Sequence, residues 1–299
     1  MAVQGETRSR RPKRGQLGGL VSGTEPRRVF TCVAELGSCF VSKYHGRQQL
    51  KMNLVIPLSL CLTILVQQAI CQDDGYQKYS CEQESIKQYI VDRHNELRAQ
   101  VRPAPSNMLK MEWDDEAAAN AALWANDCLN CHSKSNQREI TTFGCGENLY
   151  MSSRLNSWAK VIEAWWGENK FFDHGKGATE EGAVIGHYTQ LVWYKSFKLG
   201  CALSYCPNQK LAFFYVCHYC PAGNVKKDMN FPYEAGQACA KCENDCVNGL
   251  CVNACQYDDD YDECPTYKEF CEDDEEGMPE EFKVKNICKE TCYCDAEIR

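Results

Sequence analysis

The fold of this chain is decided by the stretch LGCALSYCPNQKLAFFYVCHY, residues 199–219. Two apolar runs, which predict β-strands, flank the turn-forming sequence CPNQK at residues 206–210. If the turn is centred near Gln209, Cys201 and Cys217 fall directly opposite each other. Opposed residues in an antiparallel pair have Cα atoms about 4.5–5.5 Å apart, which is within disulfide range. The stretch therefore predicts a hairpin with a cross-strand disulfide.

Three segments N-terminal to this hairpin have helical periodicity. Ser85 begins a pattern in which apolar residues recur at three-, four- and seven-residue steps. Asp114 has the residue type of an N-cap for an alanine-rich helix over residues 115–127, and Ser157 has it for a third helix. Near the end of that third helix, Glu168 continues the apolar stripe. We therefore expect its carboxylate on the interior side.

The number and spacing of the cysteines indicate the compartment. Eighteen of the 22 cysteines lie between Cys81 and Cys294. Thiols at this density persist as disulfides only in an oxidising compartment, so we expect a secreted, extracellular protein. Up to Cys220 the cysteines are interleaved with aromatic residues, whereas from Cys239 onward they are dense and large apolar residues are few. A packed core is therefore expected first, followed by a small crosslinked region.

An apolar run of 13 residues, LVIPLSLCLTILV, occupies residues 54–66. It is shorter than the roughly 20 residues that a membrane span needs. Ala69 and Cys71 then provide the small residues that precede a signal-peptidase cut. We predict a signal peptide over residues 52–71 and an upstream basic segment, residues 1–51, that is not part of the natural product. A basic cytoplasmic tail with a signal anchor is the alternative.

Charge is distributed unevenly along the chain, whose formal net charge is −8. Residues 1–51 carry ten basic and three acidic side chains, whereas residues 256–299 carry sixteen acids and five bases. A surface this acidic repels phosphate, so we exclude nucleic acid as a partner. Four of these acids have the spacing of an EF-hand loop, but Glu263 stands where that loop requires glycine. A solvated acidic surface is the preferred interpretation of these four: Asp258, Asp260, Asp262 and Glu269.

Two longer motifs lie beside and within the hairpin: GHYTQLVW at residues 186–193 and FYVCHYCPAGN at residues 214–224. Together with HNELR at 94–98 and CGE at 145–147, they resemble the signature motifs of the CAP superfamily. This resemblance implies an α+β fold, in which an α/β/α sandwich forms a CAP domain over residues 72–235.

The ten cysteines from Cys239 onward resemble the C-terminal part of cysteine-rich secretory proteins. Residues 236–254 would form the disulfide hinge of that family. Residues 255–299 would form its small helical ion-channel-regulator domain, which is similar to sea-anemone potassium-channel toxins of the ShK type.

The resemblance also implies disulfide pairs. They are Cys128–Cys206, Cys145–Cys220, Cys201–Cys217, Cys239–Cys246, Cys242–Cys251, Cys255–Cys294, Cys264–Cys288 and Cys271–Cys292. Two cysteines depart from the family pattern, Cys81 and Cys131. Because an even number of cysteines in an oxidising compartment favours pairing, we predict that these two form a ninth disulfide. The alternative is that Cys131, beside His132, is a soft metal ligand or a reactive thiol.

In CAP proteins a central cleft holds two histidines and two glutamates, which correspond here to His132, Glu147, Glu168 and His187. Two imidazoles can hold a divalent metal such as zinc, while carboxylates orient them or complete the shell. The alternative is that Glu–His hydrogen bonds tie helices to the central sheet. Zinc is therefore expected as an optional ion and not as a required cofactor. The other motif histidines, His94 and His218, are interpreted as structural.

Catalysis is not predicted. No serine or free cysteine lies inside either long motif, and the chain has no HExxH pattern. The resemblance implies a secreted, monomeric, non-enzymatic protein that binds extracellular or membrane targets and regulates an ion channel or cell-surface receptor. The alternatives are a reproductive-tract factor that binds sperm or egg surfaces, and a lipid- or sterol-binding protein. Five aromatic residues are expected either to fill the core or to line such a lipid groove: Trp158, Trp165, Trp166, Phe171 and Phe172.

One feature of the C-terminal region separates channel regulation from direct pore block. Potassium-channel blockers present a lysine with a nearby aromatic residue to an acidic pore mouth. In this chain Lys268 beside Tyr267 is the close lysine–aromatic pair in a strongly acidic region. An acidic pore mouth should repel such a surface, so we expect binding to a basic receptor patch in preference to pore plugging.

Overall fold

The computed structural model describes residues 75–261, 263–272 and 279–298. The basic segment and signal peptide predicted for residues 1–71 lie outside these described residues. Within them, no helix has both the length and the apolar composition that a membrane crossing requires.

The centre of the fold is a four-stranded sheet with the strand order β1-β5-β6-β2. Strands β5 and β6 form the predicted antiparallel hairpin, with Cys201 opposite Cys217 and a Cα–Cα distance of 4.1 Å. Strand β2 pairs antiparallel with β6, and β1 runs parallel to β5. The four strands are β1 (Glu112–Trp113), β2 (Gly146–Ser152), β5 (Lys198–Tyr205) and β6 (Phe213–Cys220).

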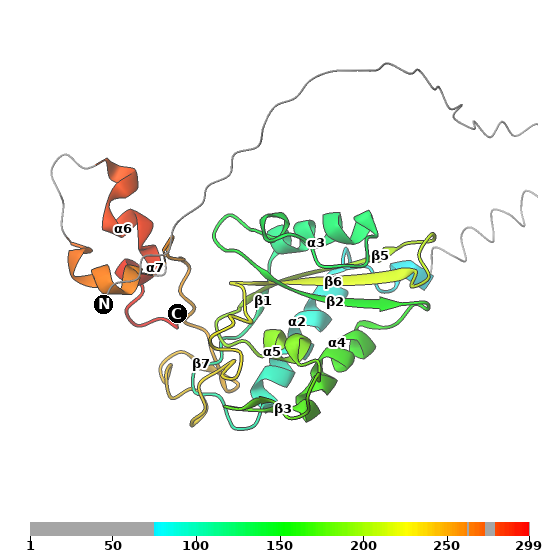
Figure 1. Ribbon diagram of the computed structural model, residues 1–299, viewed down its shortest axis with the longest axis horizontal. Coiled ribbons are helices and arrows are strands. Elements are labelled where there is room, and N and C mark those ends of the chain that lie inside the picture. The colour runs from blue at the N-terminus through cyan, green and yellow to red at the C-terminus, as the bar shows by residue number, and fades with distance from the viewer. Residues whose placement is uncertain (1–74, 262, 273–278, 299) are drawn as a thin grey trace, which may run out of the picture. The chain divides into compact units, whose positions relative to one another are not determined.

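Helices cover both faces of this sheet, which makes the α/β/α sandwich that we expected (Figure 1). On one face lies α3 (Asp115–Asp127), whose N-cap Asp114 accepts a hydrogen bond from the amide of Ala117 at 2.8 Å. On the other face lie α2 (Glu84–Gln100), α4 (Trp158–Trp166) and α5 (Gly186–Leu191). The predicted helix starts at residues 115 and 157–158 agree with the structure.

The apolar stripe of α4 lies in the core beneath the sheet. Trp158 and Trp165 are almost fully buried there with residues from α2, α5 and the central strands. These two tryptophans fill the core and do not line an open groove. The short elements nearby are η1 (Ser135–Gln137), η2 (Gly167–Phe171), β3 (Phe172–Asp173) and β4 (Gly177–Ala178).

The C-terminal part consists of short elements crosslinked by disulfides. The described residues form eight disulfides, of which the hinge region (residues 236–254) carries two and the terminal module (residues 255–298) carries three. The three in the sandwich complete the same eight pairs that the family resemblance implies. The C-terminal elements are β7 (Cys246–Val247), β8 (Leu250–Cys251), η3 (Cys264–Phe270), η4 (Glu280–Phe282), α6 (Val284–Ile287) and α7 (Lys289–Tyr293).

The predicted ninth disulfide is not formed, and Cys81 and Cys131 are both free. Cys81 packs against the core on the face covered by α2 and α4. Cys131 follows α3 on the opposite face, where its carbonyl oxygen accepts a hydrogen bond from Trp124 Nε1 at 2.8 Å. Because the sheet lies between the two positions, parity of the cysteine count was a wrong guide to pairing.

Candidate functional site

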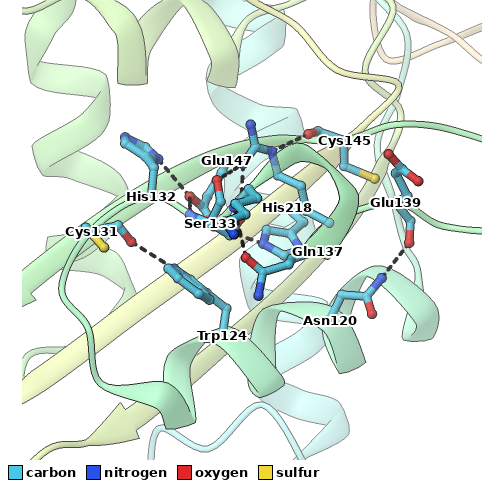
Figure 2. A network of polar contacts seen from close by, with 12 residues as sticks. Asn120, Trp124, Cys131, His132, Ser133, Gln137, Glu139, Cys145, Glu147 and His218 are labelled. Atoms are coloured by element: carbon cyan, nitrogen blue, oxygen red, sulfur yellow. Dashed lines mark hydrogen bonds and ion pairs between the residues drawn. The ribbon is translucent and has the colours of Figure 1, made fainter. Parts of the chain in front are cut away.

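Glu147 on β2 is the centre of a buried polar cluster next to α3 (Figure 2). Its Oε1 accepts hydrogen bonds from His132 Nδ1 at 2.7 Å and from the amide of Ser133 at 3.0 Å. Its Oε2 accepts from Ser133 Oγ at 2.8 Å and from His218 Nε2 at 3.1 Å. Only 1% of the Glu147 side chain is exposed, so these four donors replace water around the carboxylate.

The hydrogen bonds decide the protonation state of Glu147. Burial opposes ionisation of this carboxyl group, but the donors from His132, His218 and Ser133 outweigh it and lower its pKa to about 2. The group is therefore a carboxylate at neutral pH. Since a carboxylate only accepts, the His132 and His218 nitrogens that face it must each carry a proton.

His218 is a part of the site that sequence reasoning placed outside it. It lies on β6 directly opposite Glu147 in the strand register, and its side chain is fully buried. Its second ring nitrogen, Nδ1, has no hydrogen-bond partner among the described residues. The register of β2 against β6 was the signal that could have identified it, because residues directly opposed across two strands share a face.

A second Glu–His pair is formed by Glu168, in η2, and His187, in the first turn of α5. Glu168 Oε1 lies 2.6 Å from His187 Nδ1, and Oε2 accepts from the amides of His187 and Tyr188 at 2.9 and 3.0 Å. The His187 ring stacks on Trp165 with a centroid distance of 6.5 Å. Glu168 therefore faces the interior, as the stripe predicted, and satisfies amides that begin α5.

The two pairs are attached to neighbouring residues of β2, which is an edge strand of the sheet. Glu147 holds His132 directly, and the next residue, Asn148, donates from Nδ2 to the carbonyl oxygen of His187 at 3.0 Å. Successive side chains of a strand point to opposite faces, so the pairs approach the strand from its two sides. The structure thus connects all four predicted site residues through β2.

Each glutamate of the site holds its histidine through the same ring nitrogen. Both carboxylates engage Nδ1 of their histidine, and no hydrogen bond of the described residues uses Nε2 of His132 or His187. This is the arrangement in which a carboxylate orients an imidazole ligand from outside the metal shell. Elsewhere in the described chain, three cysteine sulfurs lie within 4.8 Å of one another, but all are committed to disulfides: Cys239, Cys242 and Cys251.

The remaining motif histidine, His94, is fully buried under the sheet. Its Nδ1 lies 2.7 Å from the carbonyl oxygen of Ile90, and its Nε2 lies 3.0 Å from the hydroxyl of Tyr219. Burial lowers the pKa of His94 to about 4, so the ring is neutral at physiological pH. It connects α2 to β6 and takes no part in the Glu–His pairs.

A separate cleft of about 550 Å³ lies between α2 and α4. Most of its lining residues have polar or charged side chains, and Arg93 of α2 pairs with Glu96 at 2.6 Å and with Glu163 of α4 at 3.1 Å. The lining residues are Tyr89, Asp92, Arg93, Glu96, Ser157, Ala159, Lys160 and Glu163.

The structure defines a disulfide-rich class of protein with two parts. One part is the α/β/α sandwich with its two Glu–His pairs, and the other is the disulfide-bonded C-terminal module. Residues 91–219 match the family model described as "Cysteine-rich secretory protein family" (CAP), and residues 239–299 match the model described as "Crisp". The chain is 50% identical to cysteine-rich secretory protein 3 of Equus caballus over 189 residues, which cover 63% of this chain and 77% of the relative.

A second relative is matched over almost its whole length. The chain is 43% identical to cysteine-rich secretory protein 2 of Homo sapiens over 247 residues, which cover 82% of this chain and 99% of the relative. This chain therefore belongs to the cysteine-rich secretory protein family. Among solved structures, that of Na-ASP-1 matches with a TM-score of 0.48 and 31% identity, over 56% of this chain and 47% of the other.

Proposed function

We propose that this protein acts outside the cell as a non-enzymatic binding protein that docks on a membrane ion channel or cell-surface receptor and regulates it. The observation that carries the proposal is how firmly the terminal module is held. Lys195, which follows the first long motif, lies 2.7 Å from Glu290 of α7, and Ile298 packs with hinge cysteines and Leu109. A pre-ordered surface loses little conformational entropy when it binds.

The geometry of the Glu147 cluster supports binding without catalysis. Ser133, the serine in this cluster, is buried and donates its hydroxyl proton to Glu147, so no histidine is placed to accept that proton. Glu147 has a pKa of about 2 and four bound donors, which makes it a poor general base at neutral pH.

The internal contacts of Lys268 argue against a pore-blocking mechanism. Lys268 directs its amine to the carbonyl oxygen of Thr291 and to the carboxylate of Asp295. An amine held by α7 in this way is not presented together with the Tyr267 ring. Regulation from an outer vestibule or a receptor patch therefore fits the module better than insertion into a pore.

We also propose that His132 and His187 provide nitrogen ligands for a divalent cation such as zinc. The support is that both Nδ1 atoms are occupied by carboxylates while both Nε2 atoms have no partner among the described residues. When bound, the ion would link the loop after α3 to α5. This would be a structural or regulatory role, since two protein ligands give an exchangeable site.

The proposed function is tested with the chain from residue 72 onward, immobilised and exposed to solubilised membranes from excitable cells and from gametes. We expect saturable capture of a membrane protein, and altered current when the same chain is applied outside a cell that bears the captured channel. Capture from gamete membranes with no effect on current would favour the reproductive alternative. Absence of saturable binding to either membrane would refute the proposal.

A further inference from the structure

The terminal module exposes an unusual number of aromatic side chains. Its buried interior is formed largely by disulfides, with Cys264, Cys288 and Cys294 among its most buried residues. Five aromatic rings are 40–60% exposed, and two pairs of them are in ring contact. Exposed aromatic groups of this kind mark interaction surfaces. They are Tyr257, Tyr261, Tyr267, Phe270 and Tyr293.

Four of these rings lie within residues 257–272, here called the acidic–aromatic segment, in which residue 262 is not described. Exposed acids are interleaved with the rings, and none of these acids forms an ion pair among the described residues. They are Asp260, Glu263, Glu269 and Glu272. The segment therefore presents negative charge that no neighbouring cation of the described chain neutralises.

The other charged groups of the segment are used for internal contacts. Asp259 accepts hydrogen bonds from the amide and hydroxyl of Thr291 at 2.9 and 2.6 Å. Asp258 faces Lys195 at 3.8 Å. Lys268, the one basic residue of the segment, is held by Thr291 and Asp295. These contacts attach the segment to α7 and to the sandwich. The groups of the segment that a partner can contact are therefore the exposed acids and rings named above.

Carboxylates interleaved with aromatic rings recognise organic cations. A guanidinium or ammonium group gains charge-assisted hydrogen bonds from the carboxylates and a cation–π contact from the rings. Arginine suits both contacts, because its planar group stacks on rings and is weakly hydrated. Anionic lipid or phosphate would be repelled by the same surface.

We propose that the acidic–aromatic segment binds an arginine-rich exposed segment of an extracellular protein. This inference rests on the proposed function and names the chemistry of its partner. The carboxylates and the rings both contribute to the binding free energy. Binding therefore depends on ionic strength, through the carboxylates, and on the π-faces of the rings.

The test uses the full chain from residue 72 and a fluorescent nonapeptide that alternates arginine and glycine, with binding followed by fluorescence anisotropy. Glu263→Gln/Glu269→Gln removes charge at constant shape, and Tyr267→Leu/Phe270→Leu removes the rings but keeps apolar bulk. We expect each double variant to bind the peptide about tenfold more weakly. The matched control, Glu180→Gln/Glu181→Gln, changes two exposed acids of the sandwich and should bind like the parent.

Disulfide mapping and thermal unfolding check that each variant folds like the parent. We expect no change in either measurement, because all substituted side chains are exposed. Parental affinity in both segment variants, or an equal loss in the control, would overturn the inference. A glutamate–glycine peptide that binds as well as the arginine peptide would also overturn it. If the Glu263/Glu269 variant still captures the membrane target, the segment is not the docking site, whereas the proposed function stands.

Discussion

Asn148 donates a hydrogen bond from Nδ2 to the carbonyl oxygen of His187 across 3.0 Å. This contact fixes the start of α5 to the strand residue that follows Glu147, and it therefore couples the two Glu–His pairs. Asn148 also donates to the hydroxyl of Tyr219 at 3.2 Å, which in turn contacts His94. One strand thus positions both histidines of the candidate site through polar contacts to either side.

Ionised Glu147 should stabilise the fold in a pH-dependent way. Its folded-state pKa of about 2 lies below the ordinary value of 4.5, so the contribution is complete above about pH 4.5 and is lost as pH falls towards 2. A shift of this size corresponds to about 3 kcal/mol. In urea unfolding, Glu147→Gln should have a lower free energy of unfolding than the parent at pH 7. Acidification to pH 3 should lower this free energy less in the variant than in the parent.

The control for this experiment is Glu243→Gln, which changes an exposed acid with no ion-pair partner among the described residues. Its free energy of unfolding should equal that of the parent at both pH values. Parallel pH profiles of the parent and Glu147→Gln would contradict the role assigned to the buried carboxylate.

Zinc affinity should depend on both His132 and His187. We expect His132→Gln and His187→Gln each to weaken zinc binding at least about tenfold in equilibrium dialysis, because each removes a ligand. Glu168→Gln should weaken it by about 10–100-fold through loss of orientation. His174→Gln is the matched control, since the His174 ring contacts Phe231 and Tyr233 and belongs to neither Glu–His pair. Unchanged zinc stoichiometry in a His132/His187 double variant would rule out this site.

Gly200 lies where α3 packs directly on β5, and it cannot carry a side chain. A Cβ atom there would lie 2.0 Å from the amide nitrogen of Ala118 and 2.4 Å from the carbonyl carbon of Ala117. Since backbone atoms cannot rotate away, Gly200→Ala should destabilise the protein by about 3 kcal/mol or more. Gly144→Ala meets nothing within 4 Å and should unfold at nearly the parental urea concentration. Equal midpoints for the two variants would disprove the close packing.

The two free cysteines should differ in reactivity. Cys131 is exposed, whereas Cys81 is only partly exposed and burial raises the pKa of its thiol. Native protein should therefore incorporate one iodoacetamide group rapidly, at Cys131, and a second much more slowly, at Cys81. Peptide mass mapping without reduction provides the measurement. A linked Cys81–Cys131 peptide would show instead that the disulfide predicted from parity does form.

Much of this fold could be predicted from the sequence because it follows from local patterns. The hairpin at residues 199–219 specifies its own register through the position of its turn, so the pairing of Cys201 with Cys217 follows from spacing alone. The N-cap of α3 and the apolar stripe of α4 are likewise local features. The cysteine spacing from Cys239 onward identified the crosslinked C-terminal region by resemblance.

The sequence by itself determined the residue types of the site, its cysteine framework and the acidic character of the terminal module. Tertiary structure decided which groups meet. It placed His218 against Glu147, attached the amine of Lys268 to α7, and put the sheet between Cys81 and Cys131. The physical reason is that hydrogen bonds and disulfides depend on distances of a few ångströms between side chains that are far apart in the chain. Such distances are fixed only when strands pair and helices pack on them.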